Sequence, residues 1–256
     1  MNPMHISSNK LLILLLFFSF YSAEAQLTTR DSARTTQLYG LSLGVYQPAG
    51  DMALNYRFFS SAEVEYLLKN KKGRIFGASF KAHYGNAVKD AEGIFSNLTD
   101  DSNNFLGVNG EFSTIQAGMS GGQLMFHFGK LLSSSYNPNS GWVILEGLGL
   151  GQHKIGLRDQ RGTLPQLQSP FLEGYDRLHI GAYTNTSVRY LHLDNDERLN
   201  WAASISFTTG ASKNIRGYNV DEAKSDDSMK FDLFYGGTFT WYIPVYRKQE
   251  SFYLVD

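Results

Sequence analysis

The sequence predicts an all-β fold, an eight-stranded antiparallel transmembrane up-and-down β-barrel over residues 38–246. Three observations predict it. An export signal opens the chain, eight later segments alternate large apolar residues with small or polar ones, and the connections between them are short and long in strict turn. An even number of strands leaves both ends of a barrel on one side of the membrane.

The N-terminus has the features of a signal peptide. Lys10 precedes the apolar run Leu11–Phe20, and Ala23 and Ala25 supply the small residues that a signal peptidase requires. An apolar run of about ten residues is too short for a spanning helix, which needs roughly twenty, so a membrane anchor is the weaker alternative. The expected organisation is a signal peptide over 1–25, a short periplasmic segment over 26–37, the barrel over 38–246 and a periplasmic tail over 247–256.

Composition excludes several function classes. The formal net charge is -1 and the sequence shows no basic patch interleaved with aromatics, so no nucleic-acid partner is expected. The chain has 0 Cys, which excludes disulfides and thiol chemistry. No glycine-rich phosphate cradle opens a helix, and we expect no cofactor.

The expected strands have two unlike faces. In Leu199–Gly210, Trp201, Ile205 and Phe207 share one face, and the other face carries small or polar residues. Small side chains suit a crowded interior, so the large apolar residues are expected to point outward, toward lipid. The stretch Met119–Gln123 (MSGGQ) predicts a bulge that shifts the alternation. The expected strands cover 38–47, 60–70, 74–84, 111–132, 142–157, 177–191, 199–210 and 229–246.

The connections provide an independent check. Those at 70–73, 133–141 and 194–197 are short, and the four between them are long, as in a barrel with short periplasmic turns and long outer loops. Gly73 supplies the positive φ that a three-residue loop needs. Pairing Asn70 with Arg74 then sets Glu63 opposite Lys81 on one face and brings three apolar pairs together on the other: Val64–Phe80, Tyr66–Ala78 and Leu68–Phe76.

These features resemble the small outer-membrane β-barrel proteins of Gram-negative bacteria, in particular those of the Bacteroidota group. The resemblance rests on the signal peptide, the eight amphipathic strands and the aromatic-rich last strand FTWYIPVY, although this chain runs on past Tyr246. It implies a location in the outer membrane, contact with lipid and periplasmic termini. A soluble periplasmic β-barrel binding protein is an alternative. Aromatic residues near the strand ends are expected to form girdles at the membrane surfaces: Tyr39, Trp142, Tyr190, Trp201, Trp241 and Tyr246.

The expected inward face carries more charge than simple filling requires. Eight strands enclose a space just wide enough to be filled by side chains, and a buried charge is costly unless it is paired. We therefore expect a plug of paired charges, with a proton or ion path as the alternative. The acidic stretches of the loops are too short for a full calcium loop, and no metal site is expected. The expected interior polar network comprises Glu63, Glu65, Lys81, His83, Arg177, Arg189 and Asp232.

The function expected is non-catalytic: a structural protein or an accessory subunit of an envelope assembly, such as a secretion or outer-membrane biogenesis machine. Some small barrels modify lipid A with a His, a Ser and a carboxylate, and such an enzyme is the alternative, with His83 or His153 as its histidine. The sequence shows no compact set joining these groups. Apolar residues in the long loops must fold over the barrel mouth or dock on a larger envelope protein. The candidates are Phe95, Phe105, Leu164, Leu167 and Phe171.

Overall fold

The computed structural model of the chain describes most of residues 32–246. The predicted signal peptide (1–25) and C-terminal tail (247–256) lie outside the described residues, and so does Phe95. The described ranges are 32–86, 88–89, 93–94, 99, 105–113, 115–159, 163–168, 171–194, 199–220 and 222–246.

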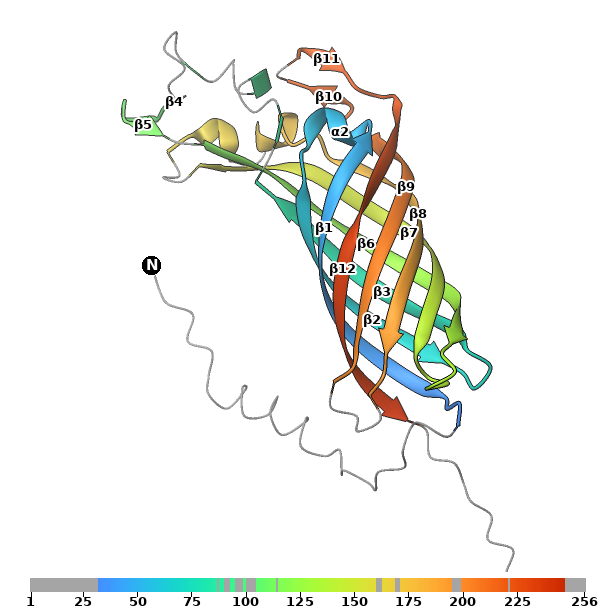
Figure 1. Cartoon of the computed structure of the whole chain (residues 1–256). Helices are drawn as coiled ribbons and strands as arrows, with labels where there is room; N and C mark the ends of the chain where they lie inside the picture. Colours follow the sequence, from blue (N-terminus) through green and yellow to red (C-terminus); the bar gives the residue numbers. More distant parts are fainter. Residues whose placement is uncertain are drawn as a thin grey trace, which may run out of the picture.

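Eight long strands form a closed antiparallel barrel, which confirms the predicted fold class (Figure 1). Each strand pairs with the long strands before and after it in the chain, and β1 pairs with β12 to close the ring. The hydrogen bonding of a closed barrel leaves no sheet edge open. The strands are β1 (Thr36–Gly50), β2 (Phe59–Lys69), β3 (Arg74–Gly85), β6 (Ile115–Ser133), β7 (Gly141–Asp159), β8 (His179–His192), β9 (Trp201–Asn214) and β12 (Met229–Tyr246).

The connections are sorted by length, as predicted. The long ones gather at one end of the barrel, the long-loop end, and the short ones at the other, the short-turn end, where β1 begins and β12 ends (Figure 1). Within the described residues, no helix is long and apolar enough to cross a membrane. The long loops hold α2 (Met52–Asn55), β4 (Phe105–Leu106), β5 (Phe112–Ser113), η2 (Pro165–Leu167), η3 (Phe171–Gly174), β10 (Tyr218–Asn219) and β11 (Lys224–Ser225).

The predicted register of β2 and β3 is confirmed. Glu63 lies opposite Lys81, and the three predicted apolar pairs lie opposite one another on the other face. Gly73 has a φ of 74°, and the backbone N–H of Asn70 donates to the carbonyl of Arg74 at 2.9 Å. The turn chemistry therefore fixes the register of this hairpin.

The predicted bulge at Met119–Gln123 is wrong. Pairing of β6 with β3 and with β7 runs through this stretch without a break. Gly121 occupies an inward position between His83 on β3 and His153 on β7. A Cβ there would lie 2.6 Å from the carbonyl oxygen of Gln152, which is too close. Because glycine has no side chain to mark a face, the alternation looked interrupted although the strand is regular.

The large apolar side chains point outward, as predicted. They include Leu41 and Leu43 on β1, Phe126 on β6 and Trp241 on β12, and Ile205 on β9 is 74% exposed. An aromatic belt surrounds the outer face near the short-turn end. Its ring centroids lie 5.2 to 6.0 Å apart in the pairs Tyr39–Tyr66, Trp142–Tyr190, Tyr190–Trp201 and Trp201–Phe239.

Candidate functional site

The barrel interior is filled in three layers, and β2 shows all three. Phe59 belongs to an apolar cluster near the long-loop end, Glu63 and Glu65 to a central layer of charges, and Leu67 to an apolar cluster near the short-turn end. Every second residue of a strand points inward, so one strand supplies each layer in turn. We call these layers the long-loop cluster, the ionic layer and the short-turn cluster.

One charge pair of the ionic layer joins β2 to β8. The guanidinium Nη1 of Arg189 donates to both carboxylate oxygens of Glu65, at 2.9 and 3.2 Å, and to the hydroxyl of Tyr242 at 2.7 Å. The hydroxyl of Tyr242 in turn donates to Glu65. All three side chains are buried. The pair therefore spans the interior, with Tyr242 from β12 joined to both charges.

The second charge pair lies between β2 and β3. The Nζ of Lys81 lies 3.4 Å from the carboxylate of Glu63 and donates to the hydroxyl of Tyr46 at 3.0 Å. The space beside these groups is a polar cavity that offers about 10 Å³ to the centre of a water molecule, which is room for about one water. The ionic layer is therefore a packed network of paired charges.

A histidine–carboxylate pair lies between the ionic layer and the long-loop end. His153 Nε2 lies 3.1 Å from Asp232 Oδ2, and the hydroxyl of Tyr183 donates to the same oxygen at 2.7 Å. His153 Nδ1 lies 3.3 Å from the hydroxyl of Tyr56, and the ring of His179 stacks on that of His153 with centroids 4.9 Å apart. A histidine that contacts a carboxylate has the arrangement of a general base.

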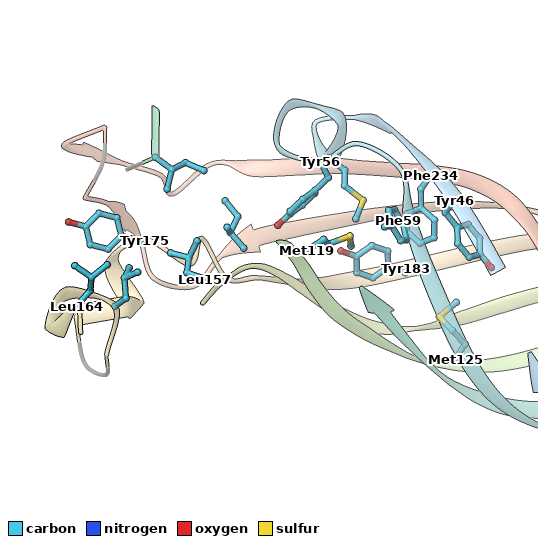
Figure 2. Close-up of a cluster of buried hydrophobic side chains, with 14 residues drawn as sticks. Tyr46, Tyr56, Phe59, Met119, Met125, Leu157, Leu164, Tyr175, Tyr183 and Phe234 are labelled. Atoms are coloured by element: carbon cyan, nitrogen blue, oxygen red, sulfur yellow. The ribbon is translucent and has the colours of Figure 1, made fainter. Parts of the chain in front are cut away.

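The long-loop cluster, whose side chains Figure 2 shows, includes Tyr56 and Tyr183, which contact this pair. Strand residues such as Phe59 and Phe234 pack with residues of the long loops, such as Met52 and Tyr175. His153 and Asp232 are accordingly only 3% and 1% exposed. The cluster comprises Tyr46, Met52, Tyr56, Phe59, Ile94, Met119, Met125, Ile155, Leu157, Leu164, Leu167, Tyr175, Tyr183 and Phe234.

The short-turn end is closed as well. Below the cluster of aliphatic side chains, the Nζ of Lys69 donates to the carbonyl of Arg34 at 2.7 Å and to Asn139 Oδ1 at 2.9 Å. The side-chain amide of Asn139 also donates to the carbonyl of Ser32 at 3.0 Å, which ties the segment before β1 to the β6–β7 turn. The short-turn cluster comprises Leu38, Leu67, Ile75, Leu131, Val143, Leu145, Leu191, Leu193, Ala202 and Tyr242.

An ionic latch joins two long loops above the long-loop cluster. Arg216 donates to both carboxylate oxygens of Asp176, at 3.0 and 2.8 Å, and to Glu173 at 2.8 Å. The hydrogen bond with Asp176 is the main reason that the pKa of Arg216 lies above its usual range. Because Asp176 is buried and Arg216 half-buried, this two-pronged contact fixes one loop against the other.

The predicted network residues lie in four places. Glu63, Glu65, Lys81 and Arg189 meet in the ionic layer, whereas His83 lies among the rings of Tyr46, Phe59 and Phe234, and Asp232 pairs with His153. Arg177 does not belong to the interior network. It precedes β8, has a φ of 43°, and its guanidinium contacts Asn55 and Glu222 of other long loops.

The predicted docking residues of the loops also divide. Leu164 and Leu167 are buried in the long-loop cluster and Phe105 packs against it, so these residues fold over the mouth. Phe171 is 66% exposed. Sequence reasoning named His153 and Asp232 separately but not as a pair, because inward alternation does not tell which strands face each other across the barrel. In the described part of the chain, no group of three or more His, Asp or Glu side chains is placed to hold a metal ion.

The chain is thus an eight-stranded antiparallel barrel with a packed interior. No protein-family model matches it. No curated protein matches it either.

Solved structures of small outer-membrane barrels are similar in outline. Ail of Yersinia pestis, crystallised with the heparin analogue sucrose octasulfate, is 11% identical with a TM-score of 0.42, over 81% of this chain and 99% of Ail. The structure of Ail in a phospholipid bilayer nanodisc gives 11% and 0.34, over 81% and 99%. The outer membrane protein OprG of Pseudomonas aeruginosa is 10% identical with a TM-score of 0.33, over 84% of this chain and 99% of OprG.

Proposed function

We propose that this protein is a non-catalytic outer-membrane barrel that serves as a structural or accessory subunit of a larger envelope assembly. The observation that carries the proposal is the reversal of its two faces. Large apolar side chains surround the outside of the barrel, and charges and hydroxyls lie inside. Such a wall is suited to hydrocarbon, where an unsatisfied backbone group costs several kcal/mol and only a closed sheet satisfies every one.

The packed interior argues against conduction. The ionic layer leaves room for about one water, and an apolar cluster lies on each side of it. The described residues therefore leave no open path for solutes through the barrel, and the paired charges serve to hold the strands together. Because the barrel does not conduct and its histidine–carboxylate pair is buried, its outer wall and its loops are the surfaces that remain for contact with other molecules.

The short-turn end is assigned to the periplasm and the long-loop end to the outside. This orientation agrees with the export signal that the sequence predicts and with the usual lengths of the connections in outer-membrane barrels. Phe171 and Phe58, both exposed on the long loops, are then available to a partner above the membrane.

The experiment that tests the proposal is purification of the tagged full-length protein from its native outer membrane in mild detergent, followed by native mass spectrometry. The proposal expects a stoichiometric complex with larger envelope proteins. A single species of the mature chain's mass would contradict the accessory role.

One observation favours a second candidate, an enzyme that modifies lipid A. His153 and Asp232 form a histidine–carboxylate pair near the long-loop end, and Ser212 is fully buried on β9 beside β12. Substrate would reach this pair only if the long-loop cluster opened. The candidate predicts that His153→Ala abolishes a change in the lipid A mass spectrum while the barrel still assembles, and an unchanged spectrum would exclude it.

A further inference from the structure

Glu146 is an acidic residue on the outer wall of the barrel. It points outward from β7, between Phe128 of β6 and Thr186 of β8, and the hydroxyl of Thr186 donates to its carboxylate at 2.8 Å. If the wall faces lipid, as the proposed function holds, this carboxylate lies against hydrocarbon. Ionisable groups within a membrane are rare and usually functional.

The depth of Glu146 follows from the strand geometry. It lies four residues beyond Trp142, a member of the aromatic belt. A rise of about 3.4 Å per residue and a tilt of roughly 40° place it about 10 Å from the belt, within an apolar band about 25 Å tall. Glu146 therefore lies well inside the band rather than at its edge.

The other outward charges are cations and lie nearer the ends of the strands. Arg74 is the first residue of β3 and pairs with Lys130, and Lys213 pairs with Met229, the first residue of β12. Lys154 lies beyond the last pair that β7 makes with β8 and forms an ion pair with Asp176. Of the outward Asp, Glu, Lys and Arg side chains that the structure describes on the eight long strands, Glu146 is the one acidic residue. The outward cation on the adjacent strand, Lys130, pairs with Ile144 rather than Glu146, and no ion pair joins the two side chains.

Small and hydroxyl-bearing side chains interrupt the apolar wall near Glu146, although Ile205 and Phe207 of β9 are large. On β8 and β9 the neighbouring outward residues include Thr184 and Thr209, whose hydroxyls lie 2.8 Å apart, and Ala182 and Ala203. The opposite wall, on β1, presents Leu41, Leu43 and Val45 instead. Small side chains let another backbone approach closely, and hydroxyls can hydrogen-bond to it.

We propose that the β7–β9 wall around Glu146 is an intramembrane docking surface for a transmembrane segment of a different protein that presents a lysine or arginine to the Glu146 carboxylate. This inference rests on the proposed function and names the chemistry of the partner. Charge complementarity indicates this kind of partner, because a cation stabilises a carboxylate that lies in hydrocarbon. A second copy of this chain fits less well, since the outward cation nearest to this depth among its described residues, Lys130, lies closer to the short-turn end and beside Arg74.

Photocrosslinking in the native outer membrane tests the surface. A benzophenone amino acid replaces Leu148, the next outward residue on β7, and in a control it replaces Val45 on the opposite wall. Leu148 lies six residues beyond Trp142, and Val45 lies six beyond Tyr39, so the two probes have matched depths. We expect a discrete protein adduct from position 148, none from position 45, and a lysine or arginine in the crosslinked transmembrane peptide.

Two variants show whether Glu146 carries the contact. Glu146→Gln removes the charge and is expected to lower the adduct yield about tenfold. Thr209→Val removes an outward hydroxyl and is expected to leave most of the yield. An adduct of twice the chain's mass, an adduct insensitive to Glu146→Gln, or lipid adducts alone would overturn the inference.

A separate measurement keeps the two proposals apart. Purified protein labelled with a fluorophore at position 148 in brominated-lipid bilayers should be quenched. Quenching without a protein adduct in native membranes would overturn the docking surface and leave the membrane placement intact. Absence of quenching would overturn the proposed function itself.

Discussion

The outer and inner faces of the barrel are built by the same eight strands, yet they carry opposite chemistry. Along β9 the outward Ile205 and Phe207 alternate with the inward Ser206 and Thr208. The outer face has little need for specific partners, whereas the inner face is a network in which Arg189 meets Glu65 and Lys81 meets Glu63. An outward apolar residue of this barrel can therefore be replaced by another apolar residue, whereas an inward charge can be replaced only together with its partner.

Breaking an inner pair is expected to have the largest effect. Arg189→Ala leaves the Glu65 carboxylate buried without its cation and should lower the free energy of unfolding by about 3–5 kcal/mol. Urea unfolding in detergent, followed by tryptophan fluorescence, measures the loss. The double variant Glu65→Gln with Arg189→Met removes both charges and should recover most of it. A loss below about 1 kcal/mol for Arg189→Ala would show that the pair does not hold the interior together.

A charge on the outer face is expected to cost somewhat less, and the cost should depend on depth. Ile205→Arg places a cation in the middle of the apolar band and should destabilise the barrel in bilayers by roughly 2–4 kcal/mol. Met229→Arg, at the first residue of β12, should cost no more than about 1 kcal/mol. Equal costs for the two variants, measured by reversible unfolding in lipid vesicles, would contradict a membrane around this wall.

The β2–β3 turn sets the register of the hairpin and so the face on which each residue lies. A substitution in the turn can strain the backbone without changing a residue on either face. Gly73→Ala puts a Cβ 2.9 Å from the carbonyl oxygen of Leu131 at a φ of 74°. The expected loss is about 1–2 kcal/mol in the same unfolding assay. The neighbouring Lys72→Ala should change stability by less than about 0.5 kcal/mol. A Gly73→Ala protein as stable as the parent would mean that the turn tolerates a different backbone.

The ionic latch of the long loops should contribute least to the barrel. Arg216→Gln removes the two-pronged contact with Asp176, so amide hydrogen exchange in residues 171–176 should become faster while the unfolding midpoint stays nearly unchanged. Lys224→Gln, on the exposed β11, serves as the control and should leave exchange as it was. A large drop in the unfolding midpoint for Arg216→Gln would show that the long loops and the barrel unfold together.

Much of the fold could be predicted because local signals repeat along the chain. Alternation marks the strands, and turn chemistry at Gly73 fixes a register that the pairing of Glu63 with Lys81 confirms. The failure at Met119–Gln123 has a physical cause, since Gly121, the inward residue between His83 and His153, has no side chain to signal a face. Arg177 was assigned inward because the predicted strand began two residues before β8 does.

The site was harder to predict because it depends on contacts across the barrel. His153 and Asp232 are 79 residues apart, and only the closed geometry brings their side chains within 3.1 Å. Glu146 lies in the stretch EGLGLG, where the glycines have no side chains to indicate which face it takes. Once the register with Phe128 and Thr186 is known, its outward position is evident.

The most direct test of the account is a residue-by-residue scan of β9 from position 203 to 208. Each position in turn receives a single cysteine labelled with a fluorophore, and the protein is reconstituted in brominated-lipid bilayers. The account predicts that labels at 203, 205 and 207 are quenched and that those at 204, 206 and 208 are not. Uniform quenching, no quenching, or the inverse alternation would contradict a barrel whose apolar face meets lipid.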